Sequence, residues 1–150
     1  MKYQIIYADP PWDVKRGPDW NSNGPSKPLP YPTMTIGEIK ALPIKELTDK
    51  NCHLYLWTIN KYIKESYEVA KEWGFDVSCM LTWVKPKHGI GTWFEHKRLK
   101  HSEKPDMFRK MVVEVSGDLP RIELFAREKT EGWDVWGNEV ESDIQLGVTP

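Results

Sequence analysis

The sequence lacks the signatures of several protein classes. It contains only two cysteines, Cys52 and Cys79, whose spacing matches no disulfide framework. Both lie in apolar, strand-like runs, so we expect two reduced, buried thiols, with a disulfide between them as the minor alternative. No apolar run approaches the roughly eighteen residues of a membrane span, and the N-terminus has no charged-then-apolar signal pattern. These absences favour a cytoplasmic protein with no membrane partner.

Motifs for metals and nucleotide phosphates are also missing. Neither Gly-x-Gly-x-x-Gly nor a phosphate-binding Gly-x-x-x-x-Gly-Lys-Ser/Thr occurs, and the histidines match no zinc spacing, so no metal site is expected. The 21 basic and 22 acidic residues give a net charge of −1, which argues neither for nor against a nucleic-acid partner. A length of 150 residues fits one domain, residues 1–150.

The most informative stretch is an apolar run, residues 5–8, that ends in Asp9, Pro10, Pro11 and Trp12. The run is too short for a helix and rich in β-formers, and the prolines cannot donate ladder hydrogen bonds, so a buried parallel strand ending at Asp9 is predicted. Ligands of open α/β sheets bind at this carboxyl edge. A turn-initiating Asp-Pro is an equally good interpretation of the tetrapeptide alone.

The chemistry of this stretch suits an amino group. A carboxylate followed by two prolines offers acceptors without competing donors. Trp12 would give a planar substrate a face to stack on, worth roughly 1–3 kcal/mol per base. Hydrogen bonds from an exocyclic amine to Asp9 and to the Pro10 carbonyl would favour a pyramidal nitrogen with an exposed lone pair. No covalent intermediate is required.

Seven short motifs follow one another along the chain: Asp9-Pro10-Pro11-Trp12, Tyr31-Pro32-Thr33-Met34, Leu54-Tyr55-Leu56-Trp57, Leu81-Thr82-Trp83-Val84-Lys85, His101-Ser102-Glu103-Lys104-Pro105-Asp106, Glu123-Leu124-Phe125-Ala126-Arg127 and Trp136-Gly137-Asn138-Glu139. Their order resembles that of the MT-A70 family of S-adenosylmethionine-dependent adenine-N6 methyltransferases, and the chain looks like a short phage or bacterial member. The resemblance spans nearly the whole sequence. It implies a Rossmann-like methyltransferase fold, with the catalytic strand first and the cofactor strands last.

The resemblance also implies roles for single residues. Asp9, Pro10, Pro11 and Trp12 would be catalytic. The contacts to S-adenosylmethionine would come from Asp9, Lys104, Phe125, Arg127, Asn138 and Glu139. Tyr31, Trp57, Trp83 and Lys85 would bind the substrate, although from the sequence alone Trp57 fits a core position equally well. The nucleic acid would be DNA in preference to RNA, and a homodimer or heterodimer stays open.

The remaining pattern predicts an α/β fold with a mostly parallel sheet. The predicted helices are Thr35 to Leu42, Lys61 to Trp73 and Ser102 to Val115, and the predicted strands are residues 53–57, Asp76 to Lys85, residues 121–126 and residues 133–136. Helical spacing assigns buried stripes to Ile63, Tyr67, Ala70 and Trp73, and to Phe108, Met111, Val112 and Val115. Residues 140–150 are expected to form a tail.

Two loops have alternative interpretations. Residues 13–30 are polar and rich in Pro and Gly, and their place after the candidate catalytic edge favours a lid or substrate loop over a tolerated surface loop. From Lys85 to Lys104 the chain carries six basic residues against two acidic ones, with Trp93 and Phe94 embedded. Such a stretch is either a phosphate-contacting surface or a solvated face.

One departure from the family concerns the segment between Phe94 and His101. The family has a further strand, a turn and another strand there, whereas Glu95 to Lys100 bridges directly. Either a deletion has removed an edge of the sheet, or a segment is absent from the sequence. This departure makes a catalytically silent nucleic-acid-binding partner one alternative function. A cytosine-N4 or RNA adenine methyltransferase is another, and a hydrolase that uses Asp9 with a histidine is the least favoured.

Overall fold

The computed structural model describes residues 2–14, 31–82 and 103–148, with the side chains of 103–105 excepted. The chain divides into two compact units. The first comprises Met1–Val77 with Pro120–Pro150, and the second comprises Ser78–Leu119. None of the described helices is both long and apolar enough to span a bilayer.

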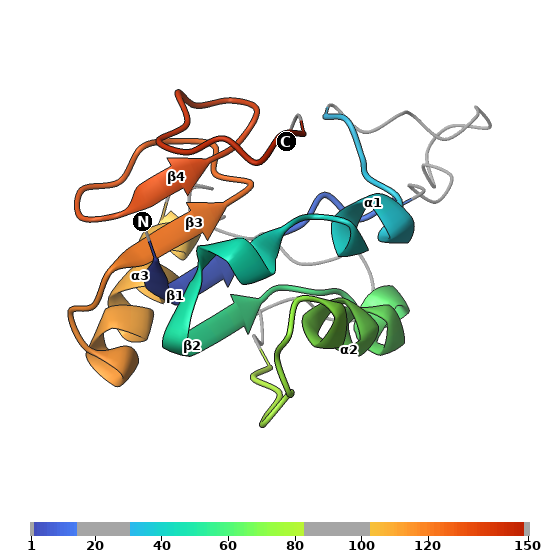
Figure 1. Ribbon diagram of the computed structural model, residues 1–150, viewed down its shortest axis with the longest axis horizontal. Helices are drawn as coiled ribbons and strands as arrows, with labels where there is room; N and C mark the ends of the chain where they lie inside the picture. The colour runs from blue at the N-terminus through green and yellow to red at the C-terminus, as the bar shows by residue number, and fades with distance from the viewer. Residues whose placement is uncertain (1, 15–30, 83–102, 149–150) are drawn as a thin grey trace, which may run out of the picture. The chain divides into compact units, whose positions relative to one another are not determined.

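The first unit is built on a parallel sheet of four strands (Figure 1). The strands are β1 (Tyr3–Ala8), β2 (Thr48–Leu56), β3 (Arg121–Leu124) and β4 (Asp134–Trp136), in the spatial order β2-β1-β3-β4. All three pairings are parallel, with Ile6 opposite Leu54 on one side and Ile122 on the other. The most apolar strand, β1, is therefore central, and the predicted parallel α/β fold is confirmed.

Two helices of this unit are fastened to each other. In α1 (Ile36–Lys40), Thr35 and Glu38 form a reciprocal capping box, which fixes the start of the helix as the sequence predicts. Helix α2 (Ile63–Glu72) follows the 3-10 helix η2 (Asn60–Tyr62) and is terminated near Gly74, whose φ is +90°. The indole Nε1 of Trp73 donates to the Ile39 carbonyl at 3.0 Å, which joins the two helices in the interior.

The buried face of α2 agrees with the predicted stripe at Ala70 and Trp73 but not at Tyr67. Tyr67 is 45% exposed, while Ser66, Val69 and Ala70 are buried. The prediction failed at Tyr67 because helical spacing alone leaves two adjacent stripes as candidates, and small side chains fit the close approach better than a phenol ring. The other 3-10 helix of this unit, η1 (Ile44–Leu47), contributes Ile44 to the core.

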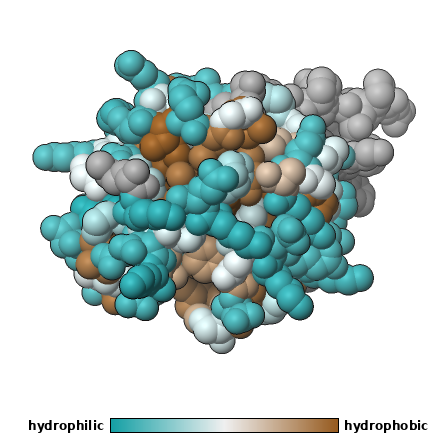
Figure 2. Space-filling model, viewed as in Figure 1, coloured by the Kyte–Doolittle hydropathy of each residue, from teal (hydrophilic) through white to brown (hydrophobic). Residues whose placement is uncertain are grey.

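The core cluster includes Tyr3, Ile6 and Ala8 of β1 and extends to Ile39 of α1 and Val69 of α2. Its largest fully buried side chains include Trp73 and Trp136. Leu146, from the C-terminal segment (residues 140–148), also belongs to it. On the face shown in Figure 2 the surface is mostly hydrophilic, with hydrophobic side chains exposed near its middle.

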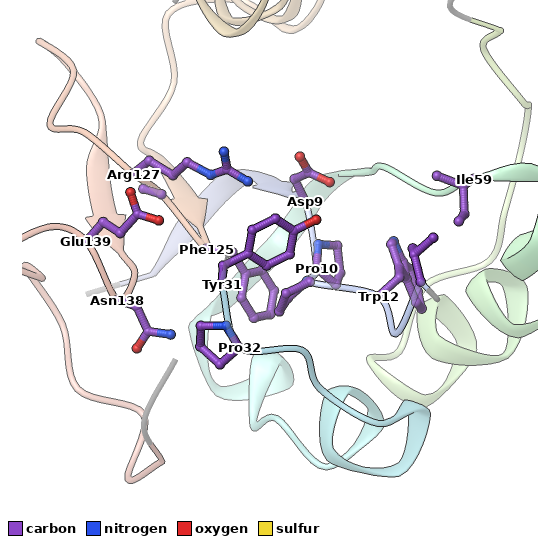
Figure 3. A pocket seen from close by; sticks show the side chains of 13 residues that line it. Asp9, Pro10, Trp12, Tyr31, Pro32, Ile59, Phe125, Arg127, Asn138 and Glu139 are labelled. Carbon is purple, nitrogen blue, oxygen red and sulfur yellow. The ribbon is translucent and has the colours of Figure 1, made fainter. Parts of the chain in front are cut away.

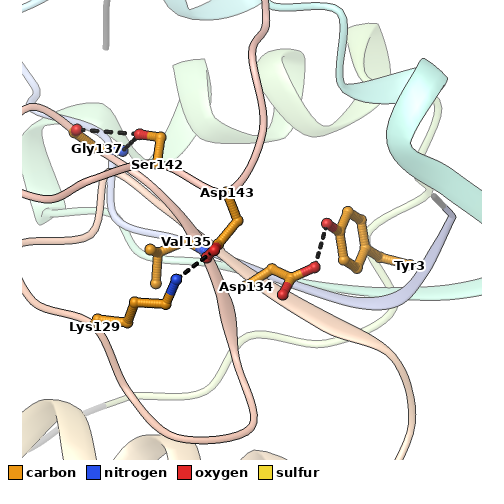
Figure 4. Close-up of polar contacts among 7 residues, drawn as sticks. All are labelled: Tyr3, Lys129, Asp134, Val135, Gly137, Ser142 and Asp143. Atoms are coloured by element: carbon orange, nitrogen blue, oxygen red, sulfur yellow. Dashed lines mark hydrogen bonds and ion pairs between the residues drawn. The ribbon is translucent and has the colours of Figure 1, made fainter.

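The C-terminal segment contacts the rest of the unit through Ser142, Asp143 and Leu146, so the prediction of a tail is wrong for this part of it. Asp143 donates its backbone N–H to the Val135 carbonyl at 2.9 Å, and its side chain accepts from the Val135 N–H at 2.9 Å. The Asp143 carboxylate also pairs with Lys129, and Ser142 accepts from the Gly137 N–H at 3.1 Å (Figure 4). The segment thereby occupies the outer edge of β4, whose backbone groups would otherwise be unpaired.

The second unit contains α3 (Glu103–Ser116), close to the predicted helix. Phe108 and Val112 are buried as predicted, but Val115 is 73% exposed, so the predicted stripe ends one turn early. Arg109 is instead only 3% exposed and donates to the Asp106 carboxylate at 2.9 Å. A basic side chain in this position is invisible to a search for apolar spacing, because the pattern counts it as polar.

The described part of the predicted strand Asp76 to Lys85 has no regular secondary structure. Met80 and Leu81 are 60% and 64% exposed, and Cys79 is exposed as well. A segment rich in β-forming residues becomes a strand only where a neighbouring strand can pair with it. The local sequence does not show whether such a neighbour exists. Both cysteines are free thiols. The predicted burial is wrong for Cys79, whereas Cys52 is half-buried in β2.

Candidate active site

Asp9 stands at the carboxyl end of the central strand, as the sequence predicts. Strand β1 ends at Ala8, whose carbonyl accepts the Trp57 backbone N–H at 2.9 Å and so extends the pairing with the β2 side by one residue. Pro10 and Pro11 then stop the strand because neither has an N–H to donate. The Asp9 residue itself is exposed. Its carboxylate is thus presented at the edge where parallel sheets bind ligands.

The two prolines shape a tight turn whose carbonyls are used by its neighbours. The Trp12 N–H donates to the Pro10 carbonyl at 2.8 Å, and the Met34 N–H donates to the Pro11 carbonyl at 3.0 Å. Trp12 and Met34 form an isolated parallel bridge. This bridge holds the segment that begins at Tyr31 beside the turn, although the two are far apart in the sequence.

Trp12 forms part of the wall of the site, and most of its side chain is buried. It is only 4% exposed, and its indole is stacked on the Tyr62 ring with centroids 5.5 Å apart and planes 21° apart. The indole Nε1 donates to the Trp57 carbonyl at 3.0 Å. One face of the indole is therefore occupied within the protein, which restricts the base stacking that the sequence assigned to it.

The ends of β3 and β4 are locked together by close backbone packing. Phe125 has a φ of +64°, a left-handed conformation that is uncommon for a bulky residue, and the Ala126 N–H donates to the Trp136 carbonyl at 3.0 Å. A Cβ added at Gly137 would lie 1.9 Å from the Ala126 carbonyl oxygen, so only glycine fits there. Strained backbone of this kind clusters at functional sites.

A cavity of about 580 Å³ opens along these strand ends (Figure 3). This volume lies within the usual range of small-molecule sites, roughly 300–1,000 Å³. The Arg127 guanidinium lies over the Tyr31 ring, 5.3 Å from its centroid, and links two segments of the wall. The lining residues are Asp9, Pro10, Pro11, Trp12, Val14, Tyr31, Pro32, Ile59, Phe125, Ala126, Arg127, Asn138 and Glu139.

The cavity unites most of the residues that the sequence indicated. All four residues of the Asp-Pro-Pro-Trp turn line it, together with Tyr31, Phe125, Arg127, Asn138 and Glu139. Trp57 is not among the lining residues and instead supports Trp12 through its backbone carbonyl. Trp83, Lys85 and most of the predicted lid, residues 15–30, lie outside the described residues, and the side chain of Lys104 is not described either.

Several lining residues were not predicted from the sequence. Pro32 and Ala126 belong to recognised motifs but were given no role of their own, and Val14 lies near the start of the predicted lid. Ile59 had the weakest signal, its place directly after the second strand. Among the residues that the structure describes, no group of three or more His, Cys, Asp or Glu side chains is placed to hold a metal ion.

Comparison with known proteins identifies relatives among methyltransferases. The chain is 27% identical to the type II methyltransferase M.MunI of Mycoplasma sp, over 93% of this chain and 78% of that protein. It is also 27% identical to the human N(6)-adenine-specific methyltransferase METTL4, and 24% identical to the N(6)-adenosine-methyltransferase MT-A70-like protein of Drosophila melanogaster. The alignments cover 92% and 93% of this chain but only 37% and 27% of those two longer proteins.

The relatives carry residues that this chain lacks. The alignment with the Mycoplasma enzyme runs over 182 positions while covering 93% of the 150-residue chain, so about 40 residues of that enzyme have no counterpart here. The MT-A70 family profile correspondingly matches in two stretches, residues 3–91 and 90–139. The break between them falls just before the shortened segment that the sequence pattern indicated, outside the described residues.

Together the two stretches take in the four-stranded sheet and every residue that lines the cavity, from Asp9 to Glu139. The matched length is well over half of the chain. The parallel sheet and the cavity at its carboxyl edge agree with a methyltransferase of this kind. The chain belongs to the MT-A70 family.

Proposed function

We propose that this chain transfers a methyl group from S-adenosylmethionine to the N6 amine of adenine in DNA, in the cytoplasm of a bacterium or of a phage-infected host. One observation carries the proposal: Asp9, followed by two prolines, stands in the middle of a cavity that has polar groups at one end. A carboxylate beside proline carbonyls accepts hydrogen bonds and offers none in return, which matches an exocyclic amine.

The polar end suits the methyl donor. Asn138 and Glu139 both line the cavity and are exposed, so their amide and carboxylate groups can bind ribose hydroxyls. Arg127 can pair with the donor's carboxylate, a role to which the family pattern also assigns Lys104. Phe125 and Asp9 supply an aromatic face and a negative charge for a sulfonium ion. S-adenosylmethionine, when bound, supplies a methyl group on a positively charged sulfur.

The turn at Asp9 orients the nucleophile. The Pro10 carbonyl already accepts one hydrogen bond, from the Trp12 N–H, and keeps a second lone pair. Two hydrogen bonds from the amine, one to the Asp9 carboxylate and one to this carbonyl, would turn the nitrogen lone pair toward the methyl carbon. The carboxylate would also stabilise the positive charge that develops on nitrogen as the N–C bond forms and the methyl–sulfur bond breaks, after which nitrogen would lose one proton to Asp9 or to water.

DNA is placed ahead of RNA for two reasons. The chain covers 78% of a bacterial type II methyltransferase but only 27% of the Drosophila protein that is named for adenosine. The resemblance to short phage or bacterial members points the same way. A duplex target would have to be flipped out of its stack, which costs a few kcal/mol.

A second candidate function follows from the residues that the relatives have and this chain lacks. A chain that lacks about 40 residues of a related enzyme is a candidate for a silent partner of an active methyltransferase. Such a partner would bind nucleic acid in a salt-sensitive way and would bind the donor weakly or not at all. The methyl-transfer assay below separates the two.

The test uses the purified chain, labelled S-adenosylmethionine and three substrates: native genomic DNA from an unmethylated strain, the same DNA heat-denatured, and RNA transcribed from it. Mass spectrometry of the digested product identifies the methylated nucleoside, and Asp9→Ala is the control. Methyl on adenine N6 in DNA, absent with Asp9→Ala, is the expected result. Methyl on cytosine N4 or on RNA corrects the substrate, and no methyl on any substrate supports the silent partner.

A further inference from the structure

An exposed aliphatic side chain forms part of the cavity wall. Ile59 is 39% exposed, follows β2 by three residues and immediately precedes η2. It lines the same cavity as Asp9 and the Asn138-Glu139 pair. A large apolar side chain that faces solvent inside a ligand cavity gains free energy when a ligand covers it.

The order of the strands separates the two ends of this cavity. Ile59 follows β2, Asp9 follows β1, and Asn138 follows β4, so the order β2-β1-β3-β4 puts Asp9 between the other two. Neighbouring strands are about 4.8 Å apart, so β2 and β4 are separated by roughly 14 Å. Figure 3 shows the same sequence of side chains, with Trp12 and Ile59 at one end and Asn138 and Glu139 at the other.

This separation allows the two ligands to be assigned to ends. The methyl donor has a charged amino-acid part and ribose hydroxyls, which match the polar end at Asn138 and Glu139. An adenine is flat and uncharged, and its amine has to reach Asp9 from the side opposite the donor. The remaining space is the apolar end, next to Ile59.

At that end, Ile59 offers a ligand more apolar surface than Trp12 does. Trp12 is 4% exposed, and one of its ring faces is covered by Tyr62. The Tyr31 ring is engaged by the Arg127 guanidinium. Ile59 is about ten times as exposed as Trp12, 39% against 4%.

We infer that Ile59 is a base-contact residue, which packs against the flat face of the target base and holds the amine at Asp9. The inference rests on the proposed function, because it takes the base to be the ligand of the apolar end. It adds a residue that belongs to none of the motifs by which the site was found, and it predicts that affinity for the base and affinity for the donor change independently.

The test compares wild type, Ile59→Ala and Val77→Ala. Val77 is a matched control, since it is 41% exposed in the same unit and does not line the cavity. A random-sequence single-stranded 20-mer in which each adenine is flanked by 2-aminopurine keeps the target amine, reports base binding by fluorescence and requires no methyl transfer. Donor binding is measured separately by calorimetry with S-adenosylmethionine, and the KM for denatured DNA is measured in the transfer assay.

Ile59→Ala should weaken 2-aminopurine DNA binding and raise the KM for DNA by about tenfold, while kcat and donor affinity stay within twofold. Val77→Ala should match wild type in every readout. Weaker 2-aminopurine binding without any methyl transfer by wild type would uphold the subsite and reject the proposed reaction. Equal affinities of Ile59→Ala and wild type, no fluorescence change with wild type, or a loss confined to donor binding each overturn the inference.

Discussion

The Trp12 indole and the Tyr62 phenol ring lie in a near-parallel stack, with centroids 5.5 Å apart and planes 21° apart. The same tyrosine donates its hydroxyl hydrogen to the Asp13 carbonyl, and Lys61 Nζ donates to that carbonyl at 3.3 Å. The second and last residues of η2 are thus fastened to Asp13, which follows the Asp-Pro-Pro-Trp motif. Tyr62 belongs to none of the sequence motifs, yet it contacts both Trp12 and Asp13.

Tyr62→Leu should therefore impair methyl transfer without loss of the fold. Removing the stack frees Trp12 to move and takes about 0.5–1.5 kcal/mol from the aromatic contact, so we expect kcat to fall roughly three- to tenfold. Tyr62→Phe keeps the stack and loses only the hydroxyl, and should retain most of the rate. Circular dichroism verifies folding, and equal kcat values for the Leu and Phe variants would show that the stack has no positioning role.

Asp9→Ala and Glu139→Ala should separate the two halves of the site. Asp9 lies between the ends of the cavity, so its loss should abolish transfer while donor affinity changes little. Glu139 lies at the polar end, so its loss should chiefly weaken donor binding, by roughly tenfold for one charge-assisted hydrogen bond. Calorimetry with S-adenosylmethionine measures both. An equal loss of donor affinity in the two variants contradicts this division of roles.

Gly137→Ala should disrupt the polar end of the cavity. The added Cβ would lie 1.9 Å from the Ala126 carbonyl oxygen, which is backbone and cannot move aside without shifting β3 or β4. We expect a fall in the free energy of unfolding of about 3 kcal/mol or more, together with lost donor binding.

Gly37→Ala is the matched control for that variant. An added Cβ there meets nothing closer than 3.9 Å, and the position lies in α1, where alanine is favoured over glycine by about 1 kcal/mol. Chemical denaturation of both variants measures the difference. A Gly137→Ala protein as stable as Gly37→Ala would mean that the backbone packing between the two strand ends is looser than described.

The parts of the site that the sequence predicts are those fixed by local chemistry. An apolar run stopped by Pro10 and Pro11 can only end near Asp9, and the Thr35 capping box and Gly74 mark helix ends by local hydrogen bonding and φ. These signals depend on a few adjacent residues. They are therefore visible without knowledge of the rest of the fold.

The parts that the sequence missed depend on which segments become neighbours. Ile59 joins the site because β2 pairs with β1. Asp143 pairs with Val135 because β4 lies at the edge of the sheet. The predicted burial of Cys79 failed for the converse reason, since the described residues of its run, 76–82, form no strand. Strand order is a property of the whole chain, and no local pattern encodes it.

The two thiols should react with alkylating reagents at different rates. Burial raises the pKa of the Cys52 thiol to about 11, so almost none of it is thiolate at neutral pH. Cys79 is exposed and should be modified first by iodoacetamide at pH 7.5. Peptide mapping by mass spectrometry follows both sites, and denaturant should abolish the difference. Faster modification of Cys52 in the folded protein would contradict its placement in β2.

The C-terminal segment should show an acid-dependent contribution to stability. Hydrogen bonds from Lys129 and from the Val135 N–H hold the pKa of the Asp143 carboxyl below its ordinary value of 3.8. A group whose pKa is lower in the folded state stabilises the fold above its unfolded pKa, and the contribution is lost as the pH falls through the folded pKa. The stabilisation is thus complete at pH 7, begins to decline near pH 4, and is lost as the pH falls through the lower folded pKa.

Asp143→Asn tests this contribution because asparagine can still accept the Val135 N–H but cannot pair with Lys129. We expect the variant to melt a few degrees below wild type at pH 7 and at pH 5, and the difference to shrink at pH 3. Lys129→Gln should show the same pattern, and the double variant should lose no more than either single change. A melting difference that is equally large at pH 3 and pH 7 would assign the effect to packing of the segment, because a contribution from the Asp143 charge must vanish once the carboxyl is protonated.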